Sequence, residues 1–428
     1  MQSSIEFLRK NGLCPPYTKL NKLDKVKSMD MPASLFDIDS SSVAVPKQAK
    51  NRSFAPTLDL FEALYENNDY LTKQIITYIG NKRSLLQFIT KGIQKVQKYL
   101  NKNRLNMFDV FSGSGIVARH FKQYSNLLLV NDLEKYVKIT SECYLSNKSD
   151  LDMNLLKSLY TDLSETITKK PLVSGIVTEL YAPKDDENVQ KDERVFYTRK
   201  NAMYIDTMRG LIDAIPQKYQ KYFLAPLLSE ASVHSNTSGV FKGFYKNREI
   251  GIGQFGGINQ DALSRIKGDI ALPFPIFSNF TGDFIVYNGD SNAVIKEASE
   301  VDLAYLDPPY NQHPYGSNYF MLNLILENKY PEQMSKISGI PENWNRSAYN
   351  KKQCAYNALS DLVTNIKAKY VLISFNSEGF ISLDEMKGML AKIGKVEVLE
   401  TTYNTFRGCR NLANRDIHVK EYLYLLEK

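Results

Sequence analysis

The sequence has few residues of the kinds that build metal sites or disulfide frameworks. Its 428 residues include four cysteines and four histidines, and none of them forms a C-x-x-C or H-E-x-x-H pattern. These thiols and imidazoles are too scattered for a zinc site or a disulfide scaffold, so we expect no metal. Such cysteine use suits a reducing compartment.

Long apolar runs are also missing. No stretch approaches the ~18 apolar residues that a membrane-spanning helix needs. The first 20 residues, MQSSIEFLRKNGLCPPYTKL, contain no apolar centre as long as that of a secretory signal. We therefore expect no membrane association and a cytoplasmic location.

Charge of neither sign dominates the chain. There are 54 basic and 47 acidic residues, which gives a formal net charge of +7. This moderate excess is compatible with a polyanionic partner and equally with an ordinary soluble protein rich in lysine. The hydrophobic content of 43% is typical of a folded chain. A chain of this length should form one large domain with an insertion or a second small domain.

The order of predicted elements indicates an α/β fold that is interrupted once. Apolar strand patterns alternate with amphipathic helical patterns, which is typical of a parallel sheet with crossover helices. The seven predicted strands are 107–111, 126–132, 284–290, 301–310, 370–377, 396–403 and 421–428. Only a short loop joins the last two strands, so these two should be antiparallel.

Three regions differ in composition. Residues 1–53 mix lysine, serine and short apolar pieces, and we predict an irregular N-terminal arm. Residues 54–150 and 281–428 carry the α/β rhythm, which opens with apolar residues at helical spacing over 58–80. Residues 151–280 form the interruption, mainly helical at first and then rich in Gly, Asn, aromatic and basic residues.

The first motif is FDVFSGSG, residues 108–115. Gly113 and Gly115 let a turn pass close to a ligand at the carboxyl end of a strand, where open α/β sheets bind ligands. The third glycine of the GxGxxG fingerprint is absent, so a nucleoside suits this turn better than a pyrophosphate. Asp132 ends the next strand 17 residues after Gly115, near the spacing at which an acid binds ribose hydroxyls. A plain strand-to-helix turn with a capping aspartate is the structural alternative.

The second motif, LDPPY, ends a predicted strand with Asp307, Pro308, Pro309 and Tyr310. The carboxylate and a proline-fixed carbonyl can both accept hydrogen bonds from an amino group, while the tyrosine ring can stack on a planar base. Accepting both amino hydrogens would direct the nitrogen lone pair toward an electrophile. We interpret this strand end as a holder for a nucleobase amino group; a proline-terminated strand with a capping Asp is the alternative.

Together these motifs resemble the S-adenosylmethionine-dependent N6-adenine DNA methyltransferases of bacterial restriction-modification systems. YIGNKRSLL, residues 78–86, is similar to their N-terminal lysine-containing motif, and the motif order, with an insertion before DPPY, is similar to their α-group. The resemblance covers most of residues 54–428, whereas the N-terminal arm has no counterpart. It implies a Rossmann-like, seven-stranded α/β methyltransferase sheet, mostly parallel with an antiparallel last strand, and an inserted, mainly helical target-recognition region at 151–280.

The resemblance also implies roles for individual residues. The residues expected to bind S-adenosylmethionine are Tyr78, Lys82, Phe111, Gly113, Ser114, Gly115, Asp132 and Asp290. The residues expected to hold the target adenine are Asp307, Pro308, Pro309 and Tyr310. The adenine would have to flip out of double-stranded DNA, because its amino group is paired and stacked inside the duplex. No metal is implied, and a separately encoded restriction endonuclease is the implied protein partner.

Basic, amide and aromatic side chains indicate a DNA-binding surface. The candidate DNA contacts are Lys242, Lys246, Arg248, Asn318, Tyr319, Arg407 and Arg410. Cationic groups neutralise phosphates, and Asn or Arg can read base edges. Asn318 and Tyr319 should lie at the lip of the base pocket, where they could brace a flipped nucleotide. Taken singly, each of these patches is more typical of a solvated surface.

Other functions stay open on the sequence alone. Related motifs grip amino or amide groups in RNA, in protein and in cytosine-N4 methyltransferases, although the last usually carry SPPY. A catalytically silent nucleic-acid-binding module is the alternative from another class, and the intact motif residues argue against it. The sequence does not fix the DNA recognition site, the number of strands methylated, the oligomeric state or whether a partner endonuclease exists.

Overall fold

The structure is a computed structural model that describes residues 65–257, 260, 262–404 and 418–428. The predicted arm, 1–53, lies outside the described residues, as do Arg407 and Arg410. Within the described part, no helix is long and apolar enough to cross a membrane. The same part holds no group of three or more His, Cys, Asp or Glu side chains placed to bind a metal ion.

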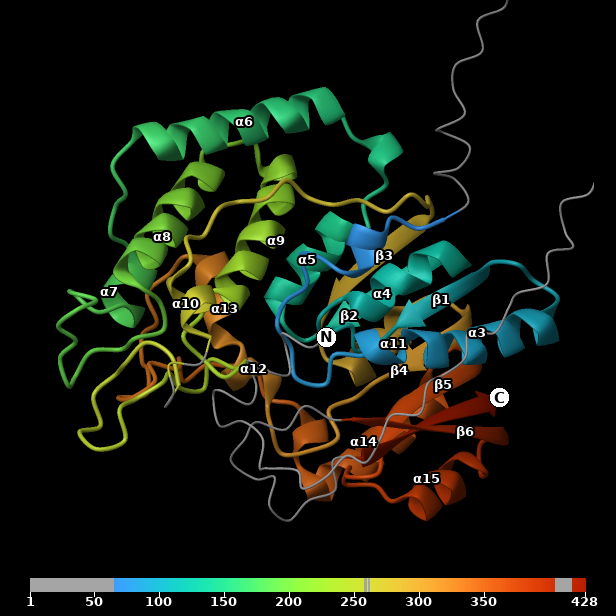
Figure 1. Cartoon of the computed structure of the whole chain (residues 1–428). Coiled ribbons are helices and arrows are strands. Elements are labelled where there is room, and N and C mark those ends of the chain that lie inside the picture. The colour runs from blue at the N-terminus through green and yellow to red at the C-terminus, as the bar shows by residue number, and fades with distance from the viewer. Residues whose placement is uncertain (1–64, 258–259, 261, 405–417) are drawn as a thin grey trace, which may run out of the picture. The chain divides into compact units, whose positions relative to one another are not determined.

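Seven strands in the described residues form a single sheet in the order β3-β2-β1-β4-β5-β7-β6 (Figure 1). The strands are β1 (Leu105–Asp109), β2 (Ser125–Asp132), β3 (Asp283–Asn288), β4 (Val301–Leu306), β5 (Ala368–Asn376), β6 (Lys395–Asn404) and β7 (His418–Glu427). The first five are parallel, and β7 pairs antiparallel with both β5 and β6. This confirms the predicted mostly parallel α/β sheet and the antiparallel pairing of the last two strands.

Helices cover both faces of the sheet, so the central strands are buried on both sides. One face packs against α3 (Leu86–Leu100) and α4 (Ile116–Phe121), the other against α11 (Ser291–Glu297), α14 (Lys352–Asn365) and α15 (Leu383–Leu390). Side chains alternate between the two layers: in β4, Leu303 and Tyr305 belong to the α3 layer, while Ala304 and Leu306 belong to the α14 layer.

Helix α3 lies unusually close to the sheet. A Cβ atom at Gly92 would come within 2.8 Å of Leu372 in β5 and 3.3 Å of Leu423 in β7. Because α3 ends just before β1 begins, its carboxyl end lies at the amino edge of the sheet. Its amino end, preceded by the 3-10 turn η2 (Arg83–Leu85), therefore reaches the edge at which the parallel strands end.

The helices of the insertion lie next to one another (Figure 1). Their buried side chains belong to a third hydrophobic core. Between β2 and β3 the chain forms η4 (Lys148–Asp150) and the helices α5 (Lys135–Tyr144), α6 (Met153–Lys169), α7 (Ile176–Tyr181), α8 (Arg199–Asp213), α9 (Gln217–Val233) and α10 (Leu263–Lys267). After β4, α12 (Tyr315–Asn318) leads into α13 (Phe320–Glu327), which packs into the same core. The mainly helical pattern predicted for the first part of the insertion is confirmed.

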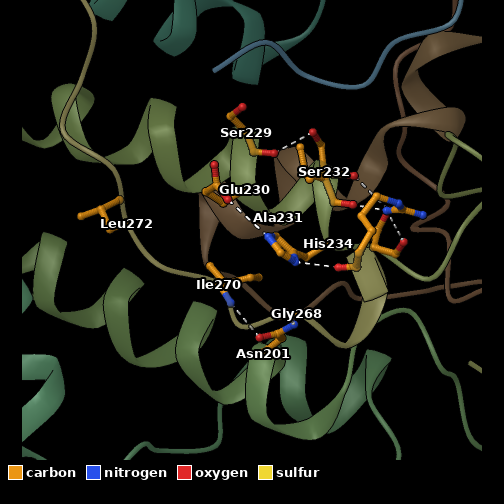
Figure 2. Close-up of polar contacts among 12 residues, drawn as sticks. Asn201, Ser229, Glu230, Ala231, Ser232, His234, Gly268, Ile270 and Leu272 are labelled. Carbon is orange, nitrogen blue, oxygen red and sulfur yellow. Dashed lines mark hydrogen bonds and ion pairs between the residues drawn. The ribbon is translucent and has the colours of Figure 1, made fainter. Parts of the chain in front are cut away.

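Figure 2 shows polar contacts at the end of α9. One further contact joins this helix end to the residue that precedes Tyr78. His234 ends the helix with its Nε2 3.4 Å from Glu230 Oε2. Two residues before His234, Ser232 Oγ donates to the Ser229 carbonyl at 2.8 Å and accepts from the Thr77 amide at 3.1 Å. The insertion thus fixes the backbone immediately before Tyr78.

The helix predicted over 58–80 is wrong in its described part. From residue 65 onward only the short 3-10 turn η1 (Asn68–Leu71) forms, and Gln74 adopts a left-handed φ of 52°. The buried guanidinium of Arg119 donates to three backbone carbonyls between residues 70 and 74, at 2.6–3.1 Å. The backbone carbonyls that would accept from the amides of a helix therefore accept from the side chain of Arg119 instead.

Candidate functional site

The strands β1, β2 and β4 end at a solvent-open cleft, with about 840 Å³ of space when the open solvent at its mouth is included. Strand order reverses at β1, because β2 lies on one side of it and β4 on the other. Open α/β sheets bind ligands at such a point. The predicted site residues that line the cleft are Tyr78, Lys82, Phe111, Gly113, Ser114, Asp132, Asp290, Asp307 and Pro309. Sequence motifs far apart in the chain thus meet at one edge of the sheet.

The FSGSG turn needs glycine at two positions. Gly113 and Gly115 have φ values of 51° and 75°, in the left-handed region that side chains disfavour. A Cβ atom at Gly113 would lie 2.9 Å from Cε1 of Tyr78, whereas one at Gly115 would meet no atom within 4 Å. The turn is therefore pressed against Tyr78 on one side and open on the other.

Asp132 joins this turn to the end of β2. Its Oδ2 accepts from the Gly113 amide and its Oδ1 from the Glu134 amide, both at 2.9 Å. Burial raises the pKa of Asp132 to about 6, against the effect of these hydrogen bonds. Asp290 is more exposed and caps α11, accepting from the Asn292 amide at 3.0 Å.

The carboxylate of the LDPPY motif is held by a buried lysine. Lys82 is 3% exposed, and its Nζ lies 3.1 Å from Asp307 Oδ1 and 3.1 Å from Glu421 Oε1. Burial alone would lower the pKa of Lys82, but the two carboxylates raise it well above its usual value. Burial likewise raises the pKa of Asp307 to about 6, with Lys82 opposing the shift.

The rest of LDPPY surrounds this ion pair. Pro308 is buried, and Pro309 and Tyr310 are half-buried. The Tyr310 ring lies below Lys82, whose Nζ is 5.4 Å from the ring centroid, and meets Phe375 edge-on at 5.8 Å. Burial raises the pKa of Tyr310, so the ring stays neutral and can offer an aromatic face.

Three tyrosines stack at one wall of the cleft. The Tyr78 ring lies parallel to Tyr315 and Tyr319, with centroid distances of 4.9 and 4.5 Å. Tyr319 is fully buried, and its hydroxyl accepts from the Ile79 amide at 2.7 Å. Asn318 is 3% exposed. The expected position of Asn318 and Tyr319 at the lip of the pocket is therefore wrong, because the stack draws this segment into the core.

The other candidate DNA contacts are exposed where they are described. Lys242, Lys246 and Arg248 lie on the surface. Lys246 pairs with Gly253 across a small antiparallel bridge, so residues 246–253 form a hairpin. Their contact with DNA remains a prediction.

Some polar residues of the site were not predicted. Glu134, which is buried and lines the cleft, accepts from Asn323 at 2.6 Å, and burial raises its pKa to about 7. Asp109 is fully buried, beside the Ser112 hydroxyl and the Phe111 amide. Burial raises the pKa of Asp109 well above its usual value, and nearby Asp307 adds to the shift. The sequence signal that could have identified Glu134 and Asp109 was their position next to the ends of β2 and β1.

Comparison with known proteins identifies relatives over most of the chain. The sequence profile of the "D12 class N6 adenine-specific DNA methyltransferase" matches residues 78–389. The chain is 28% identical over 358 residues to the type II methyltransferase M.CviAII of Paramecium bursaria Chlorella virus 1, covering 82% of this chain and 98% of that protein. It is 28% identical over 361 residues to the type II methyltransferase M.NlaIII of Neisseria lactamica, covering 82% and 99%. With modification methylase LlaI of Lactococcus lactis subsp. lactis it shares 29% identity over 344 residues, 77% of this chain and 51% of that one.

Proposed function

The chain belongs to the D12 class of N6 adenine-specific DNA methyltransferases, and from this premise we propose that it is the modification enzyme of a type II restriction-modification system. As a member of this class it is an enzyme that transfers a methyl group to adenine in DNA. The proposal adds the methyl donor, the residues that hold each reactant and the flipping of the base out of a duplex. The observation that carries the assignment of roles is the Asp307 carboxylate, which stands beside the glycine turn with one oxygen paired to Lys82.

S-adenosylmethionine suits the cleft on two grounds. It is cationic at its sulfonium and its ammonium groups, and the cleft is lined by four carboxylates, those of Asp132, Glu134, Asp290 and Asp307. The glycine turn borders the cleft through Gly113 and Ser114, and a glycine lets a nucleoside approach the backbone closely. When bound, this donor would supply an electrophilic methyl group. Tyr78, Phe111, Gly113 and Ser114 would form the walls around it, and Asp132 would accept hydrogen bonds from its ribose hydroxyls.

The LDPPY strand end would hold the target adenine. Oδ1 of Asp307 is engaged with Lys82, so Oδ2 is the oxygen left to accept from the adenine amino group. The Pro308 carbonyl would accept the second amino hydrogen, and Tyr310 would stack on the ring. Positioning and electrostatics then carry the catalysis, because the amino nitrogen is aimed and no strong base is required. The proton leaves the methylated nitrogen for solvent.

The base must reach this pocket from a duplex. Adenine N6 is paired inside DNA, so the enzyme would extrude the nucleotide by rotating it about its backbone. The exposed Lys242, Lys246 and Arg248 would neutralise phosphates around the extruded base. The tyrosine stack would not enter the duplex, because Tyr319 is buried in the core.

The modification role is tested by expression in a bacterial host that has no adenine methylation of its own. Sequencing of the host DNA should find N6-methyladenine at one recurring motif, at nearly every copy. The Asp307→Asn protein, produced at the same level, should leave that motif unmodified. Modification scattered over many sequences would contradict a site-specific restriction-modification enzyme.

A further inference from the structure

A buried carboxylate on β7 lies beside the proposed base pocket. Glu421 is 0% exposed and stands near the start of β7, opposite Asn376 at the end of β5. Because β7 runs antiparallel to its neighbours, its first residues meet the edge of the sheet at which β4 and β5 end. A residue 114 positions after Asp307 is thereby brought to the same site.

Glu421 ends a row of apolar side chains. On the α3 face of β7 the row runs from Leu425 through Leu423 to Glu421. On the same face of β4, which is separated from β7 by β5, the row runs from Leu303 to Tyr305. Both rows would be completed by leucine-sized apolar groups if packing alone decided their last positions. Each ends instead in a carboxylate, one of which is Asp307 of the base pocket. An apolar layer with no need for charge therefore ends in two acids at the cleft.

The two acids share one lysine. Lys82 Nζ lies 3.1 Å from an oxygen of each carboxylate, and it enters from the turn that precedes α3. Ser374 Oγ, from the end of β5, donates to the same Glu421 oxygen at 2.5 Å. The other Glu421 oxygen has no hydrogen-bond partner among the described residues. A buried acid of this kind is expensive to keep, and the attraction of Lys82 offsets its burial.

We propose that Glu421 is a positioning residue, which together with Ser374 anchors Lys82 so that the lysine binds only Oδ1 of Asp307 and leaves Oδ2 to the target amino group. The proposal rests on the proposed function of Asp307. Glu421 itself touches neither reactant. It acts through Lys82. An ammonium group that pairs with two carboxylates stabilises the ionised form of Asp307 less than one that pairs with Asp307 alone.

The charges around Asp307 define what removal of Glu421 should do. The groups that act on Asp307 or respond to it are Lys82, Glu421, Asp109, Tyr305, Tyr310 and Tyr315. Lys82 favours the ionised carboxylate and lowers its pKa, whereas the negative Glu421 raises the pKa. Loss of Glu421 should therefore lower the pKa of Asp307, and loss of Lys82 should raise it.

The test compares three variants of the full chain by their pH profiles of kcat/KM for DNA methylation. Glu421→Gln should move the acid limb to lower pH by about one unit, the lower end of the shifts caused by charges within ~4–6 Å. Its kcat at the optimum should fall about ten-fold, because Lys82 is less well fixed, with KM for DNA unchanged. Lys82→Met should move the limb to higher pH. Glu427→Gln, which removes an exposed acid at the other end of the same row, should keep the wild-type profile.

A second measurement gives the pKa of Asp307 independently of activity. Carboxyl-labelled aspartate, with the Asp307 signal assigned from Asp307→Asn, gives the pKa by carbon NMR. The pKa should fall in Glu421→Gln, rise in Lys82→Met and stay in Glu427→Gln. If Glu421→Gln does not fold, Ser374→Ala takes its place: it removes one hydrogen bond from Glu421 and no charge, so the less shielded Glu421 carboxylate should raise the pKa of Asp307 slightly.

The outcomes separate this inference from the proposed function. An active wild-type enzyme with an unmoved or raised pKa of Asp307 in Glu421→Gln overturns the role of Glu421 alone. A wild-type enzyme that makes no N6-methyladenine overturns the proposed role of Asp307, whatever its pKa does.

Discussion

Gly113→Ala should damage the protein more than the same change two residues later. Both Gly113 and Gly115 have left-handed backbone, so alanine at either position adds a strain of about 1–2 kcal/mol. Only at Gly113 would the new methyl group also collide, 2.9 Å from the Tyr78 ring. That ring cannot move aside freely, because it is stacked on Tyr315 and Tyr319.

The collision sets the expected difference between the two variants. Overpacking of this kind costs about 1–3 kcal/mol, so Gly113→Ala should lose roughly 2–5 kcal/mol of unfolding free energy and Gly115→Ala about 1–2 kcal/mol. The unfolded chain loses the same freedom in both variants, so that contribution cancels in the comparison. Gly113→Ala should also weaken donor binding, because a displaced turn breaks the hydrogen bond of its amide to Asp132.

Urea unfolding, followed by circular dichroism and by tyrosine fluorescence, measures the unfolding free energy of both variants, provided that both signals give one transition. Titration calorimetry with S-adenosylhomocysteine measures the affinity of the cofactor site. Equal losses of stability in the two variants would refute the argument, because they would mean that the contact with Tyr78 does not constrain the turn.

Three further predictions concern the base and the DNA. Asp307→Asn should lower kcat about 100-fold, because the amide fills the same space but is a weaker hydrogen-bond acceptor. Binding of DNA and of S-adenosylhomocysteine should be retained. Single-turnover methylation and calorimetry check these two results, and a kcat near wild type would contradict the first. In the wild type, kcat/KM should fall as pH drops through about 6, since the pKa of Asp307 is raised to about 6 and half of these carboxylates are protonated, and lost as acceptors, at that pH. A profile flat to pH 5 would contradict this. Replacing Lys242, Lys246 and Arg248 by alanine should reduce the slope of log Kd against log salt by about 0.9 for each phosphate that is no longer neutralised. Fluorescence anisotropy at several salt concentrations measures that slope. An unchanged slope would mean that DNA binds elsewhere on the protein.

The motif residues could be predicted because parallel strands all end at one edge of their sheet. Gly113, Asp132 and Asp307 each follow an apolar strand pattern, so their meeting at the cleft needed only the fold class. The sheet itself was predictable for the same reason, since apolar runs alternated with amphipathic helices and the last loop was too short for a crossover.

Residues whose position depends on tertiary contacts could not be found in this way. The segment around Tyr319 has the Asn, Gly and Pro content of a surface loop, yet its ring is buried because Tyr78 stacks on it. The spacing of apolar residues over 58–80 fitted a helix, but the carbonyls around Gln74 bind the buried Arg119 instead. Glu421 had no motif of its own, and only the antiparallel direction of β7 brings it to Lys82.

The central claim is that the cleft methylates adenine at N6, and one experiment tests it most directly. The purified chain is incubated with S-adenosylmethionine and mixed double-stranded genomic DNA, with RNA in a parallel tube, and the products are digested to nucleosides for mass spectrometry. We predict N6-methyladenine in the DNA tube and none with Asp307→Asn. N4-methylcytosine in the DNA, methylation of the RNA instead, or no modified nucleoside in either tube would contradict the account.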